Sequence, residues 1–268
     1  MQALKFLATL ITILVFFVGG LIISFLPVRF WTKQQLKTKW IQWCCKVGLF
    51  IMQVKAHIKG QLPESSFVVC NHMSYLDILV LTQIAPMSFV TSQEIRETPV
   101  LGWLCQVGGC LFVDRRSKKN IENEIQQITN SLKNNQNVVV FPEATSTNGE
   151  EVLRFKRPLY NAPIFADKPV SVLCLNYTKI NNHGFNEQNR DYICWYGDMS
   201  FVPHLWKLMS LKSVKAEVEV CEVLSTQGQS ADQLALSSHT TVTKFFKPVE
   251  KGVSYAGSSS SNSHWAKA

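Results

Sequence analysis

His72 and Asp77 are residues that can do acid–base chemistry, and they stand five positions apart in segment 68–77, VVCNHMSYLD. On one helix this offset would separate them by about 140°, so they can meet only if His72 lies in a turn and Asp77 in the first helical turn. Ser74-x-x-Asp77 has the form of a capping box, with Ser74 as the N-cap. A carboxylate there can reach back to the imidazole, hold one tautomer and favour general-base chemistry. The alternative is that Asp77 only caps the helix and His72 ends a strand.

The elements that would position these residues alternate between strands and helices. Strand-like runs lie at Phe67–Cys70, Met87–Thr91, Cys110–Val113, Val138–Phe141, Val170–Asn176 and Val214–Val223. An amphipathic helix is indicated by Ile121, Ile125, Ile128 and Leu132. We therefore predict an α/β fold with a mostly parallel sheet flanked by helices, preceded by an N-terminal membrane helix and an amphipathic interfacial helix. His72, Arg115 and Glu143 each follow a strand-like run, so they are expected to converge at the carboxyl edge of the sheet.

Asn71-His72-x-x-x-x-Asp77 resembles the N-H-x-x-x-x-D signature of the glycerolipid acyltransferases, the family of 1-acylglycerol-3-phosphate acyltransferase. Further matching segments follow at similar spacing. They are Gly102-Trp103, Phe112-Val113-Asp114-Arg115, Phe141-Pro142-Glu143-Ala144-Thr145, Phe155-Lys156 and the apolar strand that begins at Pro169-Val170. The resemblance covers roughly residues 66 to 178.

This resemblance implies transfer of a fatty acyl group from an acyl thioester to the free hydroxyl of a lysolipid, with His72 as general base oriented by Asp77. It implies direct attack by the hydroxyl, without an acyl-enzyme. A covalent route through Cys70, two residues before His72, is the alternative. Ser74 lacks the surroundings of a nucleophile elbow. The substrate-binding candidates are Asn71, Arg115, Glu143, Thr145 and Lys156, with Arg115 matching the residue that contacts the acceptor phosphate in the family.

Two departures from the family pattern concern the acceptor. The usual Glu-Gly-Thr-Arg-Ser motif has Ala144 in place of its Gly and Ser146 in place of its Arg, a phosphate contact. A Lys often found before the second motif is missing from 91–94, TSQE. Lys156, Arg157 or Arg96 is expected to compensate, or else the acceptor carries less phosphate charge.

Segments 143–149, 195–199 and 203–206 resemble a bacterial branch that includes acyltransferases of lyso-ornithine lipid. The favoured acceptor is 1-acylglycerol-3-phosphate, which would give phosphatidate in phospholipid biosynthesis, and the alternative is lyso-ornithine lipid. A third hypothesis is a lipid-binding membrane protein without turnover. The donor is expected to be acyl-CoA or acyl carrier protein, as co-substrate rather than cofactor.

The charge of the chain is concentrated near its N-terminus. The chain has 27 Lys and Arg, 19 Asp and Glu and a net charge of +8, and the first acidic residue is Glu64. The preceding segment contains Lys5, Arg29, Lys33, Lys37, Lys39, Lys46, Lys55 and Lys59. A basic segment beside an apolar one favours a membrane with anionic lipids, at ~1 kcal/mol for each cation near the surface. The balanced remainder does not indicate nucleic acid.

Phe6–Leu26 contains no charged residue and is long enough to cross a hydrocarbon core of ~30 Å. The cations that follow place the catalytic domain on the cytoplasmic side of a bacterial inner membrane. A cleaved signal peptide would need its positive charge on the other flank. A re-entrant hairpin in one leaflet stays open, because Gly19-Gly20 could bend the segment.

A second membrane-associated helix is indicated by an apolar stripe at spacings of three and four residues. Its members are Leu36, Trp40, Trp43, Val47, Phe50 and Val54. Tryptophans are typical of membrane interfaces, so the stripe predicts lipid contact. The alternative is that the stripe packs on the catalytic domain.

Eight cysteines are present without a Cys-x-x-Cys pair, which favours reduced, buried thiols in a cytoplasmic domain. The scattered histidines predict no metal site. We expect a membrane anchor with a basic amphipathic helix at 1–60, a catalytic domain at 61–250 and a disordered polar tail at 251–268.

Overall fold

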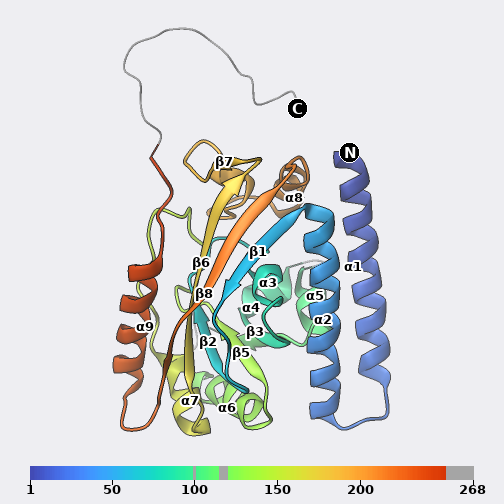
Figure 1. The fold of residues 1–268 in the computed structure, drawn as a ribbon. Helices are drawn as coiled ribbons and strands as arrows, with labels where there is room; N and C mark the ends of the chain where they lie inside the picture. The colour runs from blue at the N-terminus through green and yellow to red at the C-terminus, as the bar shows by residue number, and fades with distance from the viewer. Residues whose placement is uncertain (99–100, 115–119, 252–268) are drawn as a thin grey trace.

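The structure is a computed structural model that describes residues 1–98, 101–114 and 120–251. The predicted phosphate contact Arg115 and residues 252–268 of the predicted tail lie outside the described residues. Figure 1 shows a central twisted sheet with a pair of long helices on one side and further helices around it.

The described sheet has eight strands, and seven of them follow the order β1-β8-β6-β2-β5-β3-β4, while β7 pairs with β6. The strands are β1 (Val54–Lys59), β2 (Phe67–Cys70), β3 (Met87–Ser92), β4 (Leu111–Val113), β5 (Asn137–Val140), β6 (Val170–Ile180), β7 (His183–Gly184) and β8 (Val214–Leu224). Strands β6, β2, β5, β3 and β4 are parallel, whereas β8 runs antiparallel to β6. The predicted mostly parallel α/β sheet is therefore confirmed.

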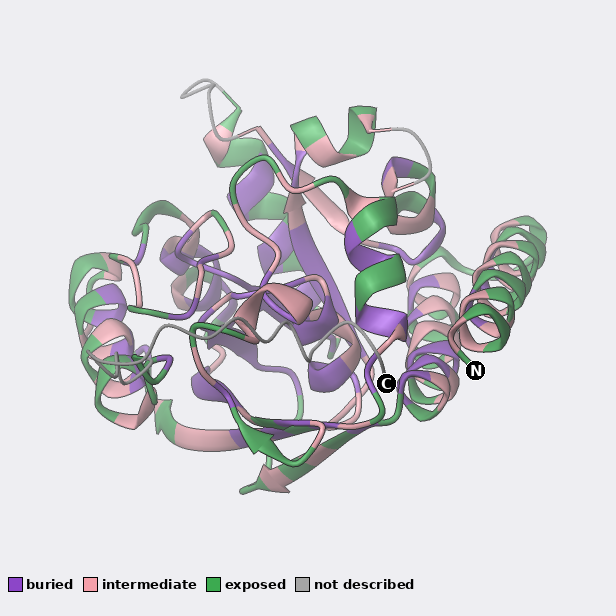
Figure 2. Ribbon diagram, turned by 90° about the horizontal axis from the view of Figure 1, so that it is seen from above, coloured by how far each residue is buried: buried purple, intermediate pink, exposed green. Residues whose placement is uncertain are grey.

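Alternate side chains of β2 enter the two cores on opposite faces of the sheet, as the pleat requires. Val68 and Cys70 pack in the core beside α2 (Phe30–Met52), α3 (Leu76–Leu81) and α8 (Phe201–Met209). Phe67 and Val69 pack in the core beside α6 (Ile121–Lys133), α7 (Asn161–Ala166) and α9 (Ala231–Phe245). Figure 2 shows the buried strands lying between these two groups of helices. The remaining helical elements are α4 (Gln93–Glu97), α5 (Leu101–Val107), η1 (Pro158–Tyr160) and η2 (Arg190–Tyr192).

Helices α1 (Gln2–Phe25) and α2 run antiparallel and form a hairpin along one side of the molecule (Figure 1). The indole of Trp40 on α2 donates a hydrogen bond of 3.0 Å to the carbonyl of Phe16 on α1. At the other end of α1, Lys5 Nζ donates to the carbonyl of Leu211 at 2.8 Å, just beyond α8. Helix α2 also bonds to the catalytic domain, because Gln34 donates to the Gly109 carbonyl at 2.5 Å and Gln42 to the Thr82 carbonyl at 2.8 Å.

The predicted stripe on α2 is turned largely outward. Leu36, Trp43 and Phe50 are exposed. The buried side of α2 instead carries Gln34, Thr38, Cys44, Cys45, Gly48, Leu49 and Met52. Val54 does not continue the stripe, because α2 ends at Met52 and Val54 begins β1. The change of direction occurs at Gln53, whose φ of 59° lies in the left-handed region.

Candidate active site

His72 and Asp77 meet as their spacing predicts. His72 follows β2, Asp77 lies in the first turn of α3, and His72 Nδ1 is 2.8 Å from Asp77 Oδ2. Because a carboxylate can only accept, Nδ1 carries the hydrogen and Nε2 of the neutral ring is left as the basic atom. The imidazole stacks on Phe141 with ring centroids 3.9 Å apart. Its side chain is 19% exposed, so the ring is partly open to the surroundings of the site.

The carboxylate of Asp77 is fully buried and is held by four donors. Oδ2 accepts from the backbone amides of Met73 and Ser74, at 2.7 and 2.9 Å, as well as from His72. Oδ1 accepts from the hydroxyl of Tyr177 on β6 at 2.7 Å. These contacts fix the carboxylate in one orientation, and through it the ring of His72.

The predicted capping box is formed only in part. Asp77 does accept the amide of Ser74, but the helix begins at Leu76, one residue later than a Ser74 cap would give. Ser74 Oγ accepts from the amide of Leu76 at 3.3 Å rather than from that of Asp77. The Asp77 amide bonds the Ser74 carbonyl instead. The turn therefore closes around Asp77, and the Asp77 carboxylate orients His72 more than it caps the helix.

Asn71 supports the turn from the sheet. Its side-chain amide donates to the carbonyl of Leu175 on β6 and accepts from the amide of the same residue, both at 2.9 Å. The residue is 1% exposed. Because both ends of the amide are engaged with the backbone of β6, this geometry suits positioning of His72 rather than the substrate contact that the family resemblance implies.

Glu143 stands beside His72 and joins two loops. One carboxylate oxygen accepts from the backbone amide of His72 and the other from that of Leu153, each at 2.7 Å. Burial raises the pKa of Glu143 to about 7, against the opposing effect of the two amides. The residue is 3% exposed, so its carboxylate orients the two loop amides, whereas the family resemblance implies substrate binding.

The loop after Glu143 wraps over the His72 turn. Thr147 donates its amide to the carbonyl of His72 at 2.9 Å, and Ser146 Oγ donates to the carbonyl of Trp195. Ala144, which replaces the Gly of the family motif, has a φ of 65° in the region that glycine adopts without strain. Thr145 is exposed at the outer side of this loop.

Three cations are expected to compensate for the Lys and the Arg that the family pattern has and this chain lacks, and they lie in different parts of the structure. Lys156 is exposed on the segment beside the site, and its amide donates to the Pro142 carbonyl at 2.9 Å. Arg157 instead pairs with Asp232 of α9 at 2.9 Å. Arg96 lies over the ring of Phe112 at 5.4 Å.

Cys70 is fully buried, and burial raises the pKa of its thiol well above the ordinary value. A thiol that stays protonated away from solvent is a poor nucleophile. All eight cysteines are free thiols, but only five of them are buried as predicted, because Cys105, Cys110 and Cys221 are partly exposed. Across residues 1–98, 101–114 and 120–251, no group of His, Cys, Asp and Glu is arranged to hold a metal ion.

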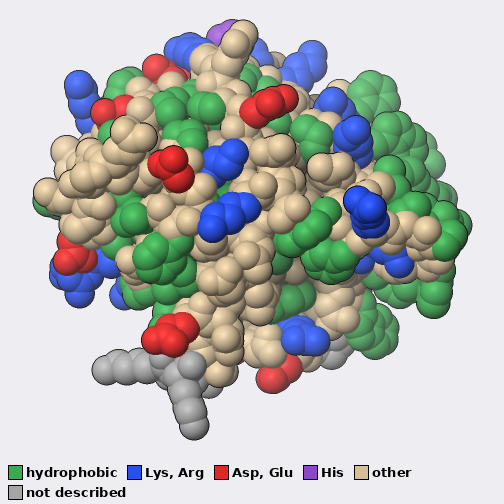
Figure 3. Space-filling view, turned by 90° about the horizontal axis from the view of Figure 1, so that it is seen from below, with side chains coloured by type: hydrophobic (Ala, Val, Ile, Leu, Met, Phe, Trp, Pro, Cys, Tyr) green, Lys and Arg blue, Asp and Glu red, His purple; other side chains and the backbone are tan. Residues whose placement is uncertain are grey.

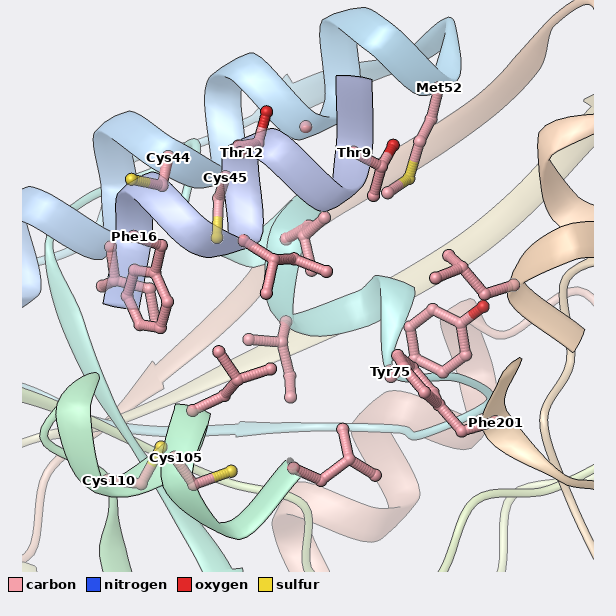
Figure 4. A pocket seen from close by; sticks show the side chains of 18 residues that line it. Thr9, Thr12, Phe16, Cys44, Cys45, Met52, Tyr75, Cys105, Cys110 and Phe201 are labelled. Atoms are coloured by element: carbon pink, nitrogen blue, oxygen red, sulfur yellow. The ribbon is translucent and has the colours of Figure 1, made fainter. Parts of the chain in front are cut away.

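An apolar cavity of about 200 Å³ lies between the hairpin and the catalytic domain. Figure 4 shows Thr9 and Phe16 of α1 on one side of this space, with Tyr75 and Phe201 at one end of the opposite side and Cys105 and Cys110 at the other end. Tyr75 is three residues from His72, and Ile78 and Leu79 of α3 line the same wall. The cavity therefore adjoins the helix that carries Asp77.

Tyr177 and His204 belong to the surroundings of the site, although sequence patterns do not reveal them. Tyr177 is one hundred positions from Asp77 and continues an ordinary apolar strand. His204 Nε2 lies 3.1 Å from the carbonyl of Cys194, so Nε2 donates and Nδ1 accepts from the Tyr75 hydroxyl at 2.9 Å. Burial lowers the pKa of His204, consistent with this neutral form.

Comparisons with known proteins agree with this geometry. The family model described as Acyltransferase matches residues 53–174. The 1-acyl-sn-glycerol-3-phosphate acyltransferase of Neisseria gonorrhoeae is 33% identical over 176 residues, and this chain spans 66% of its length while 65% of this chain is matched. The Lyso-ornithine lipid O-acyltransferase of Pseudomonas aeruginosa is 27% identical over 211 residues, covering 78% of each protein.

The fold is also similar to a solved structure. The crystal structure of the 1-acyl-sn-glycerophosphate (LPA) acyltransferase PlsC from Thermotoga maritima superposes with a TM-score of 0.63 at 19% identity. The match covers 92% of this chain and 96% of that one, so it includes most of the hairpin as well as the sheet.

Proposed function

The chain belongs to the Acyltransferase family, and we propose that it transfers a fatty acyl group from an acyl thioester to the free hydroxyl of a lysolipid. The observation that carries the proposal is the His72–Asp77 pair, whose Nδ1–Oδ2 distance is 2.8 Å and whose imidazole is partly exposed. This is the arrangement that acyl transfer to an alcohol requires of a general base.

His72 Nε2 takes the proton of the acceptor hydroxyl as its oxygen attacks the thioester carbonyl. The imidazolium is stabilised by Asp77 and then returns the proton to the departing thiolate. Attack by the acceptor itself is favoured because Cys70 is buried and protonated. No covalent acyl-enzyme is needed.

The apolar cavity supports a lipid substrate. It is bounded by α1 and α2 on one side and by α3, α5 and α8 on the other. An acyl chain of the substrate in this cavity would therefore extend from the apolar hairpin towards the His72 turn. Among the described residues that line the cavity, three carry hydroxyl groups, namely Thr9, Thr12 and Tyr75. The others are apolar side chains and thiols, which suits a hydrocarbon chain rather than a polar substrate.

The proposed acceptor is 1-acylglycerol-3-phosphate, with acyl-CoA or acyl carrier protein as donor. Lyso-ornithine lipid is the second candidate, and one observation favours it. Ser146, which stands where the family has a phosphate-binding Arg, hydrogen-bonds the carbonyl of Trp195 and brings no positive charge to the site. The similarity to both named relatives supports each acceptor.

We also propose that the protein acts at the cytoplasmic face of a bacterial inner membrane, with the hairpin inserted into one leaflet. α1 is the one helix in the described ranges that is long and apolar enough to cross a membrane. However, Gln2 and Lys5 at its beginning hydrogen-bond carbonyls of Trp206 and Leu211, and Trp40 bonds its middle. A helix attached to the domain at its beginning and to α2 at its middle is better suited to shallow insertion than to spanning.

The test is product formation by the full chain in membranes, with labelled acyl-CoA or acyl carrier protein and either acceptor. We expect His72→Ala to lower the rate by a factor of ~10²–10⁴, the usual value of a general base. Asp77→Asn should have a similar effect, because an amide that donates to Nδ1 would place the proton on Nε2. Tyr177→Phe keeps the aromatic ring and removes one of the four donors to Asp77, so we expect a smaller loss of rate from it. Activity that survives in His72→Ala would contradict the mechanism.

A further inference from the structure

We infer that Arg154, together with Lys156, forms a phosphate-recognition pair at the mouth of the site, where it binds a phosphate group of the substrate. The inference rests on the proposed function, because it assigns a role to residues beside the same His72. Arg154 belongs to none of the matching motifs in the sequence.

The position of the pair follows from the contacts of its neighbours. Leu153 and His72 donate their amides to the two oxygens of one carboxylate, that of Glu143, at 2.7 Å each. Lys156 then donates its amide to the carbonyl of Pro142 at 2.9 Å. Residues 153–156 therefore run alongside 142–143, and Arg154 follows directly after the residue that shares Glu143 with the catalytic turn.

The side chains in this segment alternate between core and solvent. Phe155 is 3% exposed and packs edge-on against His239 of α9, at a centroid distance of 5.2 Å. Arg154 and Lys156 on either side of it are both exposed. Alternate residues of an extended segment share a face, so the two cations point away from the core that holds Phe155.

Within the described part of the chain, no hydrogen bond or ion pair occupies the side chain of Arg154 or Lys156. By contrast, Arg157 in the same segment pairs with Asp232, and Arg190 pairs with Glu150. Two uncommitted cations beside a reactive histidine are suited to a dianionic or diester phosphate, which an Arg binds with two parallel hydrogen bonds. They would supply the positive charge that Ser146 does not.

Two substrates could provide the phosphate. One is the acceptor, if it is lysophosphatidate, and the other is the donor, because CoA and the prosthetic group of acyl carrier protein both carry phosphate. Lyso-ornithine lipid has no phosphate, so a comparison of the two acceptors with a common donor separates these sources.

The experiment compares Arg154→Ala, Arg154→Lys and Lys156→Ala with the matched control Arg157→Ala, which removes the same charge from the same segment. The full chain is assayed in detergent or vesicles with lysophosphatidate and lyso-ornithine lipid. Arg154→Ala is expected to raise the relevant KM about tenfold or more, with kcat changed much less and partial recovery in Arg154→Lys. A KM increase for lysophosphatidate alone assigns the acceptor phosphate, whereas an increase for the donor with either acceptor assigns the donor phosphate.

Equilibrium binding of labelled lysophosphatidate and of CoA to the same variants provides a readout that does not depend on turnover. Loss of binding in Arg154→Ala but not in Arg157→Ala supports the pair even if no acceptor is turned over. If wild-type protein turns over no lysolipid, the proposed function fails, which is a separate result. If Arg154→Ala behaves as Arg157→Ala does in both KM and binding, the inference is overturned.

Discussion

At the scale of single residues, Glu143 is subject to opposing influences on its charge. Two backbone amides at 2.7 Å favour the carboxylate, while burial of the side chain favours the neutral acid. Burial is the larger effect, so the pKa of Glu143 rises from its ordinary value of 4.5 to about 7. The native protein therefore retains a proton that the unfolded chain has released between these two pH values.

This difference makes stability depend on pH in a defined direction. Because the native state binds the extra proton, the contribution of Glu143 is fully present below pH 4.5 and is lost as pH rises to about 7. The whole change is on the order of 3 kcal/mol. Glu143→Gln cannot titrate, so its free energy of unfolding should fall less than that of wild type between pH 5 and pH 8.

Urea unfolding of both proteins in detergent at the two pH values measures this difference. Glu64→Gln, at an exposed position, controls for the removal of one carboxyl group. Equal pH dependence in wild type and Glu143→Gln would show that the burial of Glu143 does not govern its protonation.

Sequence patterns were sufficient to predict the central pair but not its surroundings. The five-residue offset places His72 and Asp77 together because it requires a turn followed by a helix, and the structure has this arrangement. The Tyr177 hydroxyl and the engagement of Asn71 with Leu175 depend on the pairing of β2 with β6. Local sequence contains no information on that pairing across one hundred residues.

At the scale of elements, the contact between α1 and α2 depends on Gly19, which has no side chain to keep the helices apart. A Cβ added at Gly19 would lie 2.3 Å from Cζ2 and 2.4 Å from Cε2 of Trp40. The indole cannot move aside freely, because it donates to the Phe16 carbonyl and stacks on Trp43 at 5.2 Å. Gly19 therefore permits the close packing of the hairpin rather than bending the helix.

Gly19→Ala separates packing from helix propensity. Propensity alone would stabilise α1 by ~1 kcal/mol, whereas the clash with Trp40 should destabilise the protein by ~1–3 kcal/mol. We expect a lower melting temperature and faster maleimide labelling of Cys44, which is buried against Phe16. Val18→Ala, at an exposed position on the same helix, should change stability by less than ~0.5 kcal/mol. A melting temperature raised by Gly19→Ala would show that the two helices are not closely packed.

The strands were more predictable than the connections between them. Phe67–Cys70 was predicted with its observed bounds, because four consecutive apolar residues suit a strand buried on both faces. β1 was missed because Val54 fits the helical spacing of the preceding stripe. Its pairing with β8 comes from the αL residue Gln53, whose carbonyl accepts the amide of Val214, and no periodicity reveals that contact.

At the scale of the whole molecule, apolar surface and positive charge are gathered on the same side. The outer face of α1 exposes Leu7, Leu14, Ile22 and Phe25, and α2 adds Trp43 and Phe50. Figure 3 shows hydrophobic side chains collected along the margin where the hairpin lies, with Lys and Arg side chains beside them. A soluble surface rarely exposes so large an apolar area, so this face is suited to lipid, with the cations placed to contact anionic headgroups.

This arrangement predicts how the protein binds vesicles. An Asp buried in hydrocarbon costs ~2.5–3.5 kcal/mol, so Leu14→Asp combined with Ile22→Asp should abolish most co-flotation of the full chain with phosphatidylglycerol vesicles. Leu236→Asp on α9 is the matched control, because Leu236 is 69% exposed but lies on the opposite side of the molecule (Figure 1). Binding should weaken with phosphatidylcholine and with added salt, since the cations of the hairpin contribute through screened attraction. Equal loss of flotation in Leu236→Asp would mean that general hydrophobicity, rather than insertion of the hairpin, holds the protein at the membrane.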